Sequence, residues 1–224
     1  MGIQERKERE RGQRRNAILS SARAAFIKHG LATTSMERIA KEAELAKGTL
    51  YLYFHSRDEL LIGLISNDLE ILIQRLIVVT ILPLSADEKL FRAFAEFHAF
   101  SKENKFFFQV MTQLNVAQMV GGDHSQETLA NFSRVNQRVF GIIQDIVQEG
   151  VNAGVFVLHA PLEDVVVQLI IAIKGSIVIL KNNMVPPMWV RQDEQTLLRQ
   201  IVQMLLRGIT RPDVVHKNHA GALS

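Results

Sequence analysis

The chain of 224 residues contains no cysteine, which excludes disulfide bonds, thiolate metal ligands and a cysteine nucleophile. Long apolar runs are also lacking. The most apolar stretch, residues 165–180, includes Gln168 and Lys174, so it predicts a buried helix rather than a membrane span. The N-terminus is highly charged and has no apolar stretch behind it, which a signal peptide would need. These absences favour a globular protein of the cytoplasm.

Motifs typical of enzymes and metal sites are missing as well. The sequence has no Gly-rich phosphate loop, no His-x-x-x-His pair and no nucleophile elbow. The acidic pairs at 58–59 and 87–88 fall in the first turns of predicted helices, where the helix dipole explains them. We therefore expect no enzymatic activity, no metal ion and no cofactor.

Helical periodicity runs through almost the whole chain, and no long stretch alternates with a period of two. We therefore predict an all-α protein of about nine helices. Three capping boxes, each a Ser or Thr three residues before a Glu, predict helix starts: Thr34–Glu37, Ser56–Glu59 and Ser85–Glu88. The longer predicted helices span residues 56–82, 105–120, 125–152, 162–183 and 191–208.

Positive charge is concentrated at the start of the chain. Through residue 60 there are 12 Lys and Arg against 8 Asp and Glu, whereas the remainder has 14 against 15. This asymmetry indicates a polyanionic partner for the N-terminal quarter. It also suggests a small basic domain, residues 12–60, followed by a larger apolar domain, residues 61–210.

Residues 36–54 have the pattern of two short helices joined by a tight turn. The first presents Ile39 and Ala40, and the second, starting near residue 47, presents Leu50 and Phe54. This is the packing of a helix-turn-helix, whose second helix is offered to the major groove of DNA. So short a helix is not stable alone in water. We predict that Leu50 and Phe54 anchor it to a three-helix core and leave its polar side free.

The polar side of the second helix carries groups that bind phosphate. Its N-terminus has free N–H groups and a favourable dipole, and its tyrosine hydroxyls can donate to phosphate oxygens. At the start of the preceding helix, Thr34 and Ser35 would meet the backbone across the groove. The residues of the second helix that we expect at DNA are Lys47, Gly48, Thr49, Tyr51 and Tyr53.

Residues 12–60 closely resemble the TetR family of bacterial transcriptional regulators. The resemblance rests on "ILSSARAAFIKHGLATTSMERIAKEAELAKGTLYLYFHSRDEL", with its Phe-x-x-x-Gly, Ile-Ala and Lys-Gly-Thr-Leu-Tyr-x-Tyr-Phe elements. It implies an N-terminal helix-turn-helix domain and a C-terminal helical domain for ligand binding and dimerisation. It also places these residues at DNA-contacting positions: Thr34, Ser35, Lys47, Gly48, Thr49, Leu50, Tyr51, Tyr53 and His55.

The chain departs from the family pattern at three positions. Glu44 stands where the family often has a turn glycine, and a left-handed Glu costs about 1 kcal/mol relative to Gly. Ala46 stands where a Ser or Thr would cap the second helix, a loss of about 1 kcal/mol. His55 stands in place of a frequent lysine, so its contact with phosphate would be weaker or pH-dependent.

The C-terminal region is rich in aromatic residues at helical spacing, which either form a core or line a pocket. The candidates are Phe94, Phe97, His98, Phe106, Phe107, Phe108, Met111, Phe132 and Phe140, with polar Gln113 and Asn115. From these we predict a ligand site for a mainly apolar small molecule. Its residues are Phe94, His98, Phe107, Met111 and Phe140.

Two late helices have the composition of a subunit interface. Helix 162–183 is apolar on more than one side, and Gly175 and Ser176 allow close helix crossing. A second apolar stripe runs through residues 197–205. We expect a homodimer whose interface is a four-helix bundle, as the resemblance also implies. Lys174 would reach solvent or pair with a carboxylate.

The leading hypothesis is a dimeric repressor that binds a palindromic operator and is released by an apolar small molecule. An activator, or a DNA-organising protein without a ligand, remains an alternative. So does a helical protein that sequesters a small molecule and whose basic head does not bind DNA. An enzyme that uses the helical pocket is a more remote alternative.

Overall fold

The computed structural model describes residues 2–113, 122 and 124–211. Within these ranges the chain forms nine α-helices and no strand, apart from one isolated bridge between Phe156 and Thr210. The all-α prediction is confirmed. None of the helices in this described part is long and apolar enough to cross a membrane.

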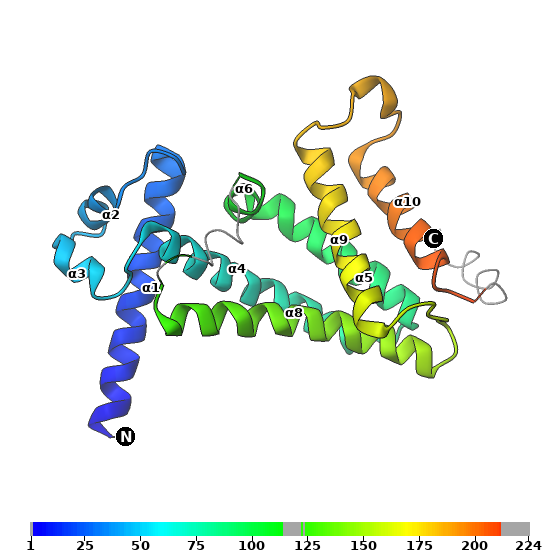
Figure 1. Ribbon diagram of the computed structural model, residues 1–224, viewed down its shortest axis with the longest axis horizontal. Helices are drawn as coiled ribbons and strands as arrows, with labels where there is room; N and C mark the ends of the chain where they lie inside the picture. Colours follow the sequence, from blue (N-terminus) through cyan, green and yellow to red (C-terminus); the bar gives the residue numbers. More distant parts are fainter. Residues whose placement is uncertain (1, 114–121, 123, 212–224) are drawn as a thin grey trace. The chain divides into compact units, whose positions relative to one another are not determined.

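The helices follow one another along the chain as labelled in Figure 1. They are α1 (Ile3–His29), α2 (Met36–Glu42), α3 (Lys47–Tyr51), α4 (Arg57–Thr80), α5 (Ala86–Glu103), α6 (Lys105–Gln113), α8 (Gln126–Asn152), α9 (Leu162–Lys181) and α10 (Glu194–Arg207). Four of the five long helices that we predicted correspond to α4, α8, α9 and α10, with ends displaced by only a few residues. Of the helix predicted over 105–120, only α6 falls in the described residues; Asn115 lies outside them.

The chain divides into two compact units, Met1–Glu70 with Asn104–Val135, and Ile71–Glu103 with Asn136–Ser224. The first unit contains α1, α2, α3 and α6 and the beginnings of α4 and α8. The second contains α5, α9, α10 and the remainder of α4 and α8. The predicted functional boundary after residue 60 stays a prediction.

Local capping explains where several helices begin. The Ser56 hydroxyl accepts the Glu59 N–H (3.0 Å), and the Glu88 carboxylate accepts the Ser85 N–H (2.9 Å). The box predicted at Thr34 is wrong, because α2 starts one residue later and Ser35 caps it. The Thr34 hydroxyl is buried and donates instead to the Gly30 carbonyl (2.7 Å).

The core of the first unit is built from α1, α2, α3, α6 and the first half of α4. Leu50 and Phe54 are fully buried, which confirms that these two residues anchor the short α3. Burying such side chains contributes about 1.5–3 kcal/mol each. The Phe106 ring of α6 packs at a tilt of 32° against the Phe26 ring of α1, with ring centres 6.1 Å apart. This contact explains why the chain returns to the first unit after α5.

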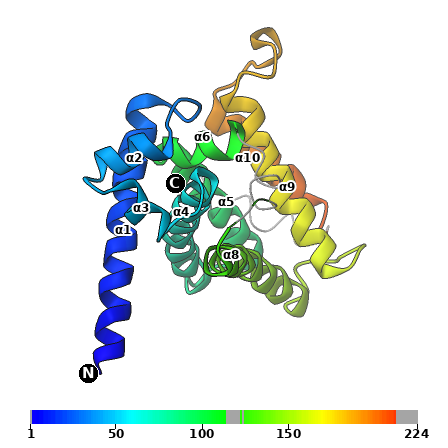
Figure 2. The same ribbon diagram turned by 60° about the vertical axis from the view of Figure 1, so that its left-hand side comes forward.

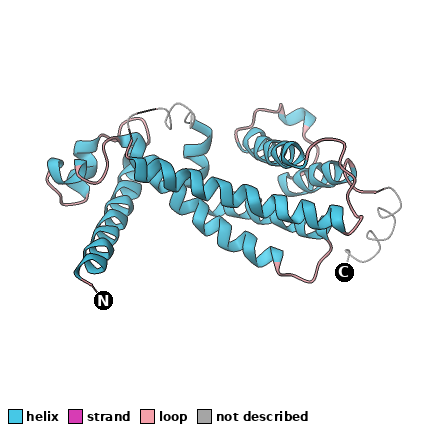
Figure 3. Ribbon diagram, turned by 60° about the horizontal axis from the view of Figure 1, so that its bottom comes forward, coloured by secondary structure: helices cyan, strands magenta, loops and turns pink. Residues whose placement is uncertain are grey.

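The second unit packs apolar stripes of its helices against one another. In Figure 3 its described elements are helices joined by loops. The ammonium of Lys89, on α5, lies 2.8 and 2.9 Å from the two carboxylate oxygens of Glu149, on α8. The buried apolar residues of α9 and α10 are Val165, Val166, Leu169, Ile173, Ile177, Leu198, Val202 and Leu206.

Candidate nucleic-acid interface and ligand groove

The turn between α2 and α3 is tight and left-handed. Glu44 has φ = 54°, and the Leu45 N–H donates to the Ala40 carbonyl (2.9 Å). Ala46 is the N-cap of α3 and provides no side-chain hydrogen bond. Both features expected to weaken the start of this helix are therefore present.

The nine residues expected at DNA differ in exposure. Thr34 and Leu50 are buried, so any contact that they make with DNA must come from their backbone. The exposed members are Ser35, Lys47, Gly48, Tyr51 and His55, and the half-buried ones are Thr49 and Tyr53. Except for Thr34 and Leu50, the predicted set therefore presents side chains or backbone at the surface of the unit.

Lys47 has a partner that the sequence reasoning missed. Its ammonium forms an ion pair with the Glu37 carboxylate of α2 and lies 5.8 Å from the centre of the Tyr51 ring. The hydrogen bond to Glu37 raises the pKa of Lys47 and lowers the pKa of Glu37. The sequence did offer a signal for this pair, because Glu37 and Lys47 carry opposite charges and lie on the two helices that the predicted turn joins. An anion that binds Lys47 would have to compete with Glu37.

Gly48 is not required by the packing of the protein itself. A Cβ atom added there would meet no heavy atom within 4 Å, and its φ is not among the positive glycine values. The close approach of the Gly48 backbone to a phosphate therefore stays a prediction that the open surroundings allow.

Behind α3, Arg15 connects three segments of the first unit. Its guanidinium carbon lies 4.2 Å from the centre of the Phe54 ring. It donates to the Tyr53 carbonyl (3.3 Å) and to the Thr128 hydroxyl (2.8 Å). Burial lowers the pKa of Arg15, although nearby carboxylates partly oppose this. Arg15 thereby ties the residues that follow α3 to α1 and α8.

Glu59 is a buried carboxylate in the same region. It accepts the His55 N–H (2.6 Å), the Thr128 hydroxyl (2.8 Å) and the Ser125 hydroxyl. Burial by itself raises the pKa of Glu59, but these hydrogen bonds outweigh it, and the pKa lies below its ordinary value. The sequence indicated only a capping role, because Ser125 and Thr128 are far away along the chain.

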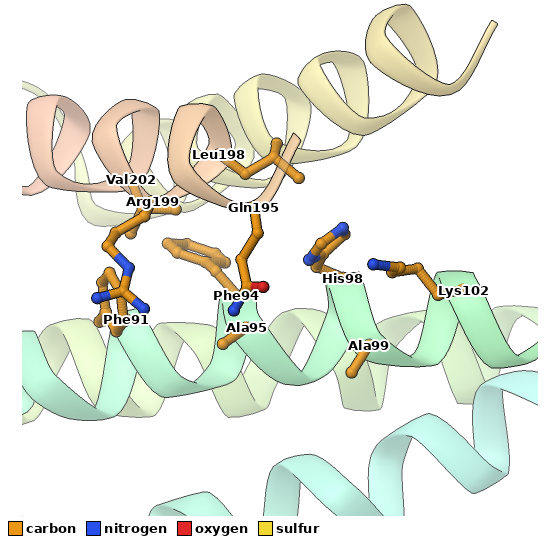
Figure 4. Close-up of a pocket in the computed structure, with 10 residues that line it drawn as sticks. All are labelled: Phe91, Phe94, Ala95, His98, Ala99, Lys102, Gln195, Leu198, Arg199 and Val202. Carbon is orange, nitrogen blue, oxygen red and sulfur yellow. The ribbon is translucent and has the colours of Figure 1, made fainter. Parts of the chain in front are cut away.

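The second unit has a groove between α5 and α10, of about 240 Å³. Figure 4 shows aromatic and aliphatic side chains between the two helices, with basic side chains along it. Its lining residues are Phe91, Phe94, Ala95, His98, Ala99, Lys102, Gln195, Leu198, Arg199 and Val202. The imidazole Nε2 of His98 is 2.8 Å from a carboxylate oxygen of Glu194.

Only two of the five residues predicted to bind a ligand line this groove. Phe94 and His98 line it, whereas Phe140, on α8, does not. Phe107 and Met111 lie on α6, in the other compact unit. The sequence reasoning missed Lys102, Gln195 and Arg199, because surface polar residues on α5 and α10 carry no local sign of facing each other.

α9 exposes apolar residues away from its buried stripe. Val167, Ile171 and Ile179 are 43%, 64% and 40% exposed. Lys174 of the same helix has a lowered pKa because of burial. It has no carboxylate partner among the residues that the structure describes, so the pairing considered from sequence is not found there.

Comparison with known proteins gives a family match for the helix-turn-helix segment. Residues 18–64 match the model of the family described as bacterial regulatory proteins, tetR family. Matches to the first curated relatives, all named as helix-turn-helix transcriptional regulators, span only 19–25% of the length of those proteins.

Longer similarities cover both units. The fatty acid metabolism regulator protein of Bacillus subtilis is 25% identical over 137 residues, which are 61% of this chain and 68% of that protein. A TetR/AcrR-family regulator from Thermobifida fusca has a TM-score of 0.61 at 21% identity, covering 89% of this chain and 100% of the other. FadR from Bacillus subtilis, solved with stearoyl-CoA, has a TM-score of 0.64 at 20% identity, covering 86% and 98%.

At these identities the solved structures show the fold alone. The matched segment contains the end of α1, the helix-turn-helix and the start of α4, which are the elements that hold α3 and its exposed side. Residues 18–64, which carry the helix-turn-helix, match the N-terminal domain of the tetR family of bacterial regulatory proteins.

Proposed function

We propose that this protein is a transcriptional repressor that binds a palindromic operator as a homodimer and is released by a mainly apolar small molecule. The observation that carries the proposal is the construction of α3. Its buried side, Leu50 and Phe54, fixes the helix, and its exposed side presents Lys47, Gly48 and Tyr51. Phosphate contacts from such groups position a recognition helix in the major groove.

The dimer is supported by the exposed apolar residues of the two late helices. Val167 and Ile171 of α9 and Met204 of α10 are all exposed by more than a third. A second copy would cover this surface through a four-helix interface of α9 and α10. Two helix-turn-helix units related by a twofold axis would then match a palindromic site.

The ligand proposal rests on the second unit and on the relatives. The groove offers Phe94 and His98. The candidates Phe107, Met111 and Phe140 lie outside this groove and stay predictions from the sequence. Because a similar fold has been solved with stearoyl-CoA, a long-chain fatty acyl thioester is the first ligand class to test. A protein that only sequesters such a ligand would need no exposed cation at the start of α3.

The direct test is binding to short duplexes selected by the protein from a random-sequence pool. We expect a palindromic consensus and an affinity that falls steeply between about 50 and 200 mM salt. Lys47→Ala should weaken binding and lower the salt slope by about 0.9 for each phosphate that the variant no longer binds. Lys28→Ala, which removes a similarly exposed lysine paired with Glu42, serves as the control.

Addition of stearoyl-CoA should release the duplex and raise the melting temperature of the protein. Failure to select any duplex, or a Lys47→Ala variant with unchanged affinity and slope, would contradict DNA recognition through α3. Stabilisation by stearoyl-CoA without any DNA binding would favour sequestration.

A further inference from the structure

The first turns of α1 lie outside the core of the first unit. Every side chain from residue 4 to residue 11 is exposed, and the first buried residue of the helix is Ile18. In Figures 1 and 2 this part of α1 projects beyond α2 and α3. A helix of this length gains little stability without a packing partner, so packing within the unit does not explain the extension.

One face of α1 changes character where the core ends. Positions 7, 11, 14, 18, 22 and 25 are spaced by three or four residues and therefore form one stripe along the helix. The last three, Ile18, Ala22 and Ala25, are buried in the core of the first unit. The first three are Lys7, Arg11 and Arg14, which we call the basic stripe.

The glutamates of this segment do not neutralise the basic stripe. Glu10 pairs with Arg6, on another face, at 2.8 Å. Arg11 approaches Glu127 of α8 at 3.6 Å, and both side chains are more than half exposed. Lys7 and Arg14 have no carboxylate partner among the residues that the structure describes. The uncompensated positive charge therefore lies along the continuation of the core-facing side.

We infer that the basic stripe is a second DNA contact, which holds the phosphate backbone of the duplex that α3 recognises. This inference rests on the proposed function. Ammonium and guanidinium groups bind phosphate oxygens irrespective of base sequence. From Lys7 to Arg14 the helix rises about 10 Å, a length over which duplex DNA presents about six phosphates.

DNA fits this surface better than other polyanions do. The stripe lies on α1, which packs against α2, and α2 packs against α3 within the same compact unit. A duplex held by α3 therefore approaches the unit that carries the stripe. An anionic membrane would require apolar residues beside the cations, and residues 4–16 offer none. If the stripe bound an acidic protein surface instead, its variants would bind the selected duplex with the affinity and salt slope of the wild-type protein.

The test compares two double variants that remove the same charge. Lys7→Gln/Arg14→Gln alters the basic stripe, and Arg6→Gln/Arg9→Gln alters other sides of the same turns. Binding to the duplex selected by the wild-type protein is measured by fluorescence anisotropy over a salt series. The stripe variant should lower the salt slope by about two per bound protomer, at about 0.9 per phosphate contact. The control should stay near the wild-type slope, and Lys7→Arg/Arg14→Lys should restore it.

Because the altered residues lie outside the core, the melting temperature and helical content should not change. These two measurements distinguish a lost DNA contact from misfolding of the variant. Equal slopes for the wild type and the stripe variant would overturn the inference and leave recognition through α3 intact. Equally weakened binding in both double variants would also overturn it, since net charge alone would then explain the effect. A stripe variant whose defect persists in a Lys47→Ala background supports a contact separate from α3.

Discussion

Glu44 has a left-handed backbone conformation that costs a residue with a Cβ atom about 1 kcal/mol. It lies in the turn that aims α3, two residues before the uncapped Ala46. Neither residue stabilises the start of this helix. The orientation of α3 in the absence of DNA therefore depends on the burial of Leu50 and Phe54.

Replacing Glu44 by glycine should stabilise the protein. Relief of the left-handed strain exceeds the entropy that glycine adds to the unfolded chain, so we expect a gain of roughly 0.5–1 kcal/mol in the free energy of unfolding. Chemical denaturation measures it. Asn183→Gly is the matched control, because Asn183 is also left-handed (φ = 50°) but asparagine tolerates that region. If Glu44→Gly were less stable than the wild-type protein, the left-handed conformation of Glu44 would not be a source of strain.

The ion pair between Glu37 and Lys47 predicts a variant that binds DNA more tightly. Glu37→Gln frees the ammonium of Lys47 and removes a negative charge from the surface that we propose as the DNA contact. We expect a gain of roughly two- to fivefold in affinity, since exposed ion pairs contribute little, and the gain should shrink at high salt. Glu42→Gln, which breaks a comparable pair with Lys28, should have a smaller effect. Weaker binding by Glu37→Gln would mean that Glu37 positions Lys47 for DNA.

At the scale of the helices, hydrogen bonds connect the end of the helix-turn-helix to the starts of α4 and α8. Glu59 of α4 accepts hydrogen bonds from the end of the recognition segment and from Ser125 and Thr128. Arg15 of α1 bonds to Thr128 and packs on Phe54. A displacement of the first turn of α8 would therefore reach the residues that follow α3 directly.

Glu59→Gln should destabilise the protein by about 2–3 kcal/mol at neutral pH, the range for hydrogen bonds to a buried charged group. Because the pKa of Glu59 is lowered in the folded state, its contribution is present above the ordinary glutamate value of about 4.3. It is lost as the pH falls through the folded-state pKa.

Urea unfolding at several pH values measures this contribution. The difference between wild type and Glu59→Gln should be constant above about pH 5.5 and shrink below about pH 4.3. Asp58→Asn, at a neighbouring half-buried carboxylate, is the control and should show a smaller difference. A difference that does not change with pH would assign the effect to packing instead.

For the whole molecule, α9 is a regular helix with several apolar residues that a single chain leaves exposed. Ile171 is 64% exposed in the middle of a helix whose other side is buried. An apolar surface on a regular helix is typical of a subunit interface.

Ile171→Glu should dissociate the proposed dimer, because it places charges at the centre of the α9 surface. A central interface residue contributes about 2 kcal/mol, so the dimer dissociation constant should rise by roughly thirtyfold or more. Analytical ultracentrifugation measures it, and affinity for a palindromic duplex should fall in parallel. Ile81→Glu, at another strongly exposed isoleucine (76%) outside α9 and α10, should leave the dimer intact. A dimer that persists in Ile171→Glu would place the interface elsewhere.

The sequence by itself determined the helices and the helix-turn-helix. Periodicity, capping residues and turn breakers act within a few residues, so α4, α8, α9 and α10 and the burial of Leu50 and Phe54 could be predicted. The same local reasoning identified Glu44 and Ala46 as departures, and the backbone of the turn bears this out.

Only the tertiary structure decided which distant residues meet. It brought Glu59 to Ser125 and Thr128 and placed α6 in the first unit. It also joined Phe94 and His98 to Gln195 and Arg199 in one groove, without Phe107, Met111 or Phe140. The physical reason is that a helical stripe encodes which side of a helix is buried. The partner that buries it depends on the path of the whole chain, which no local window contains.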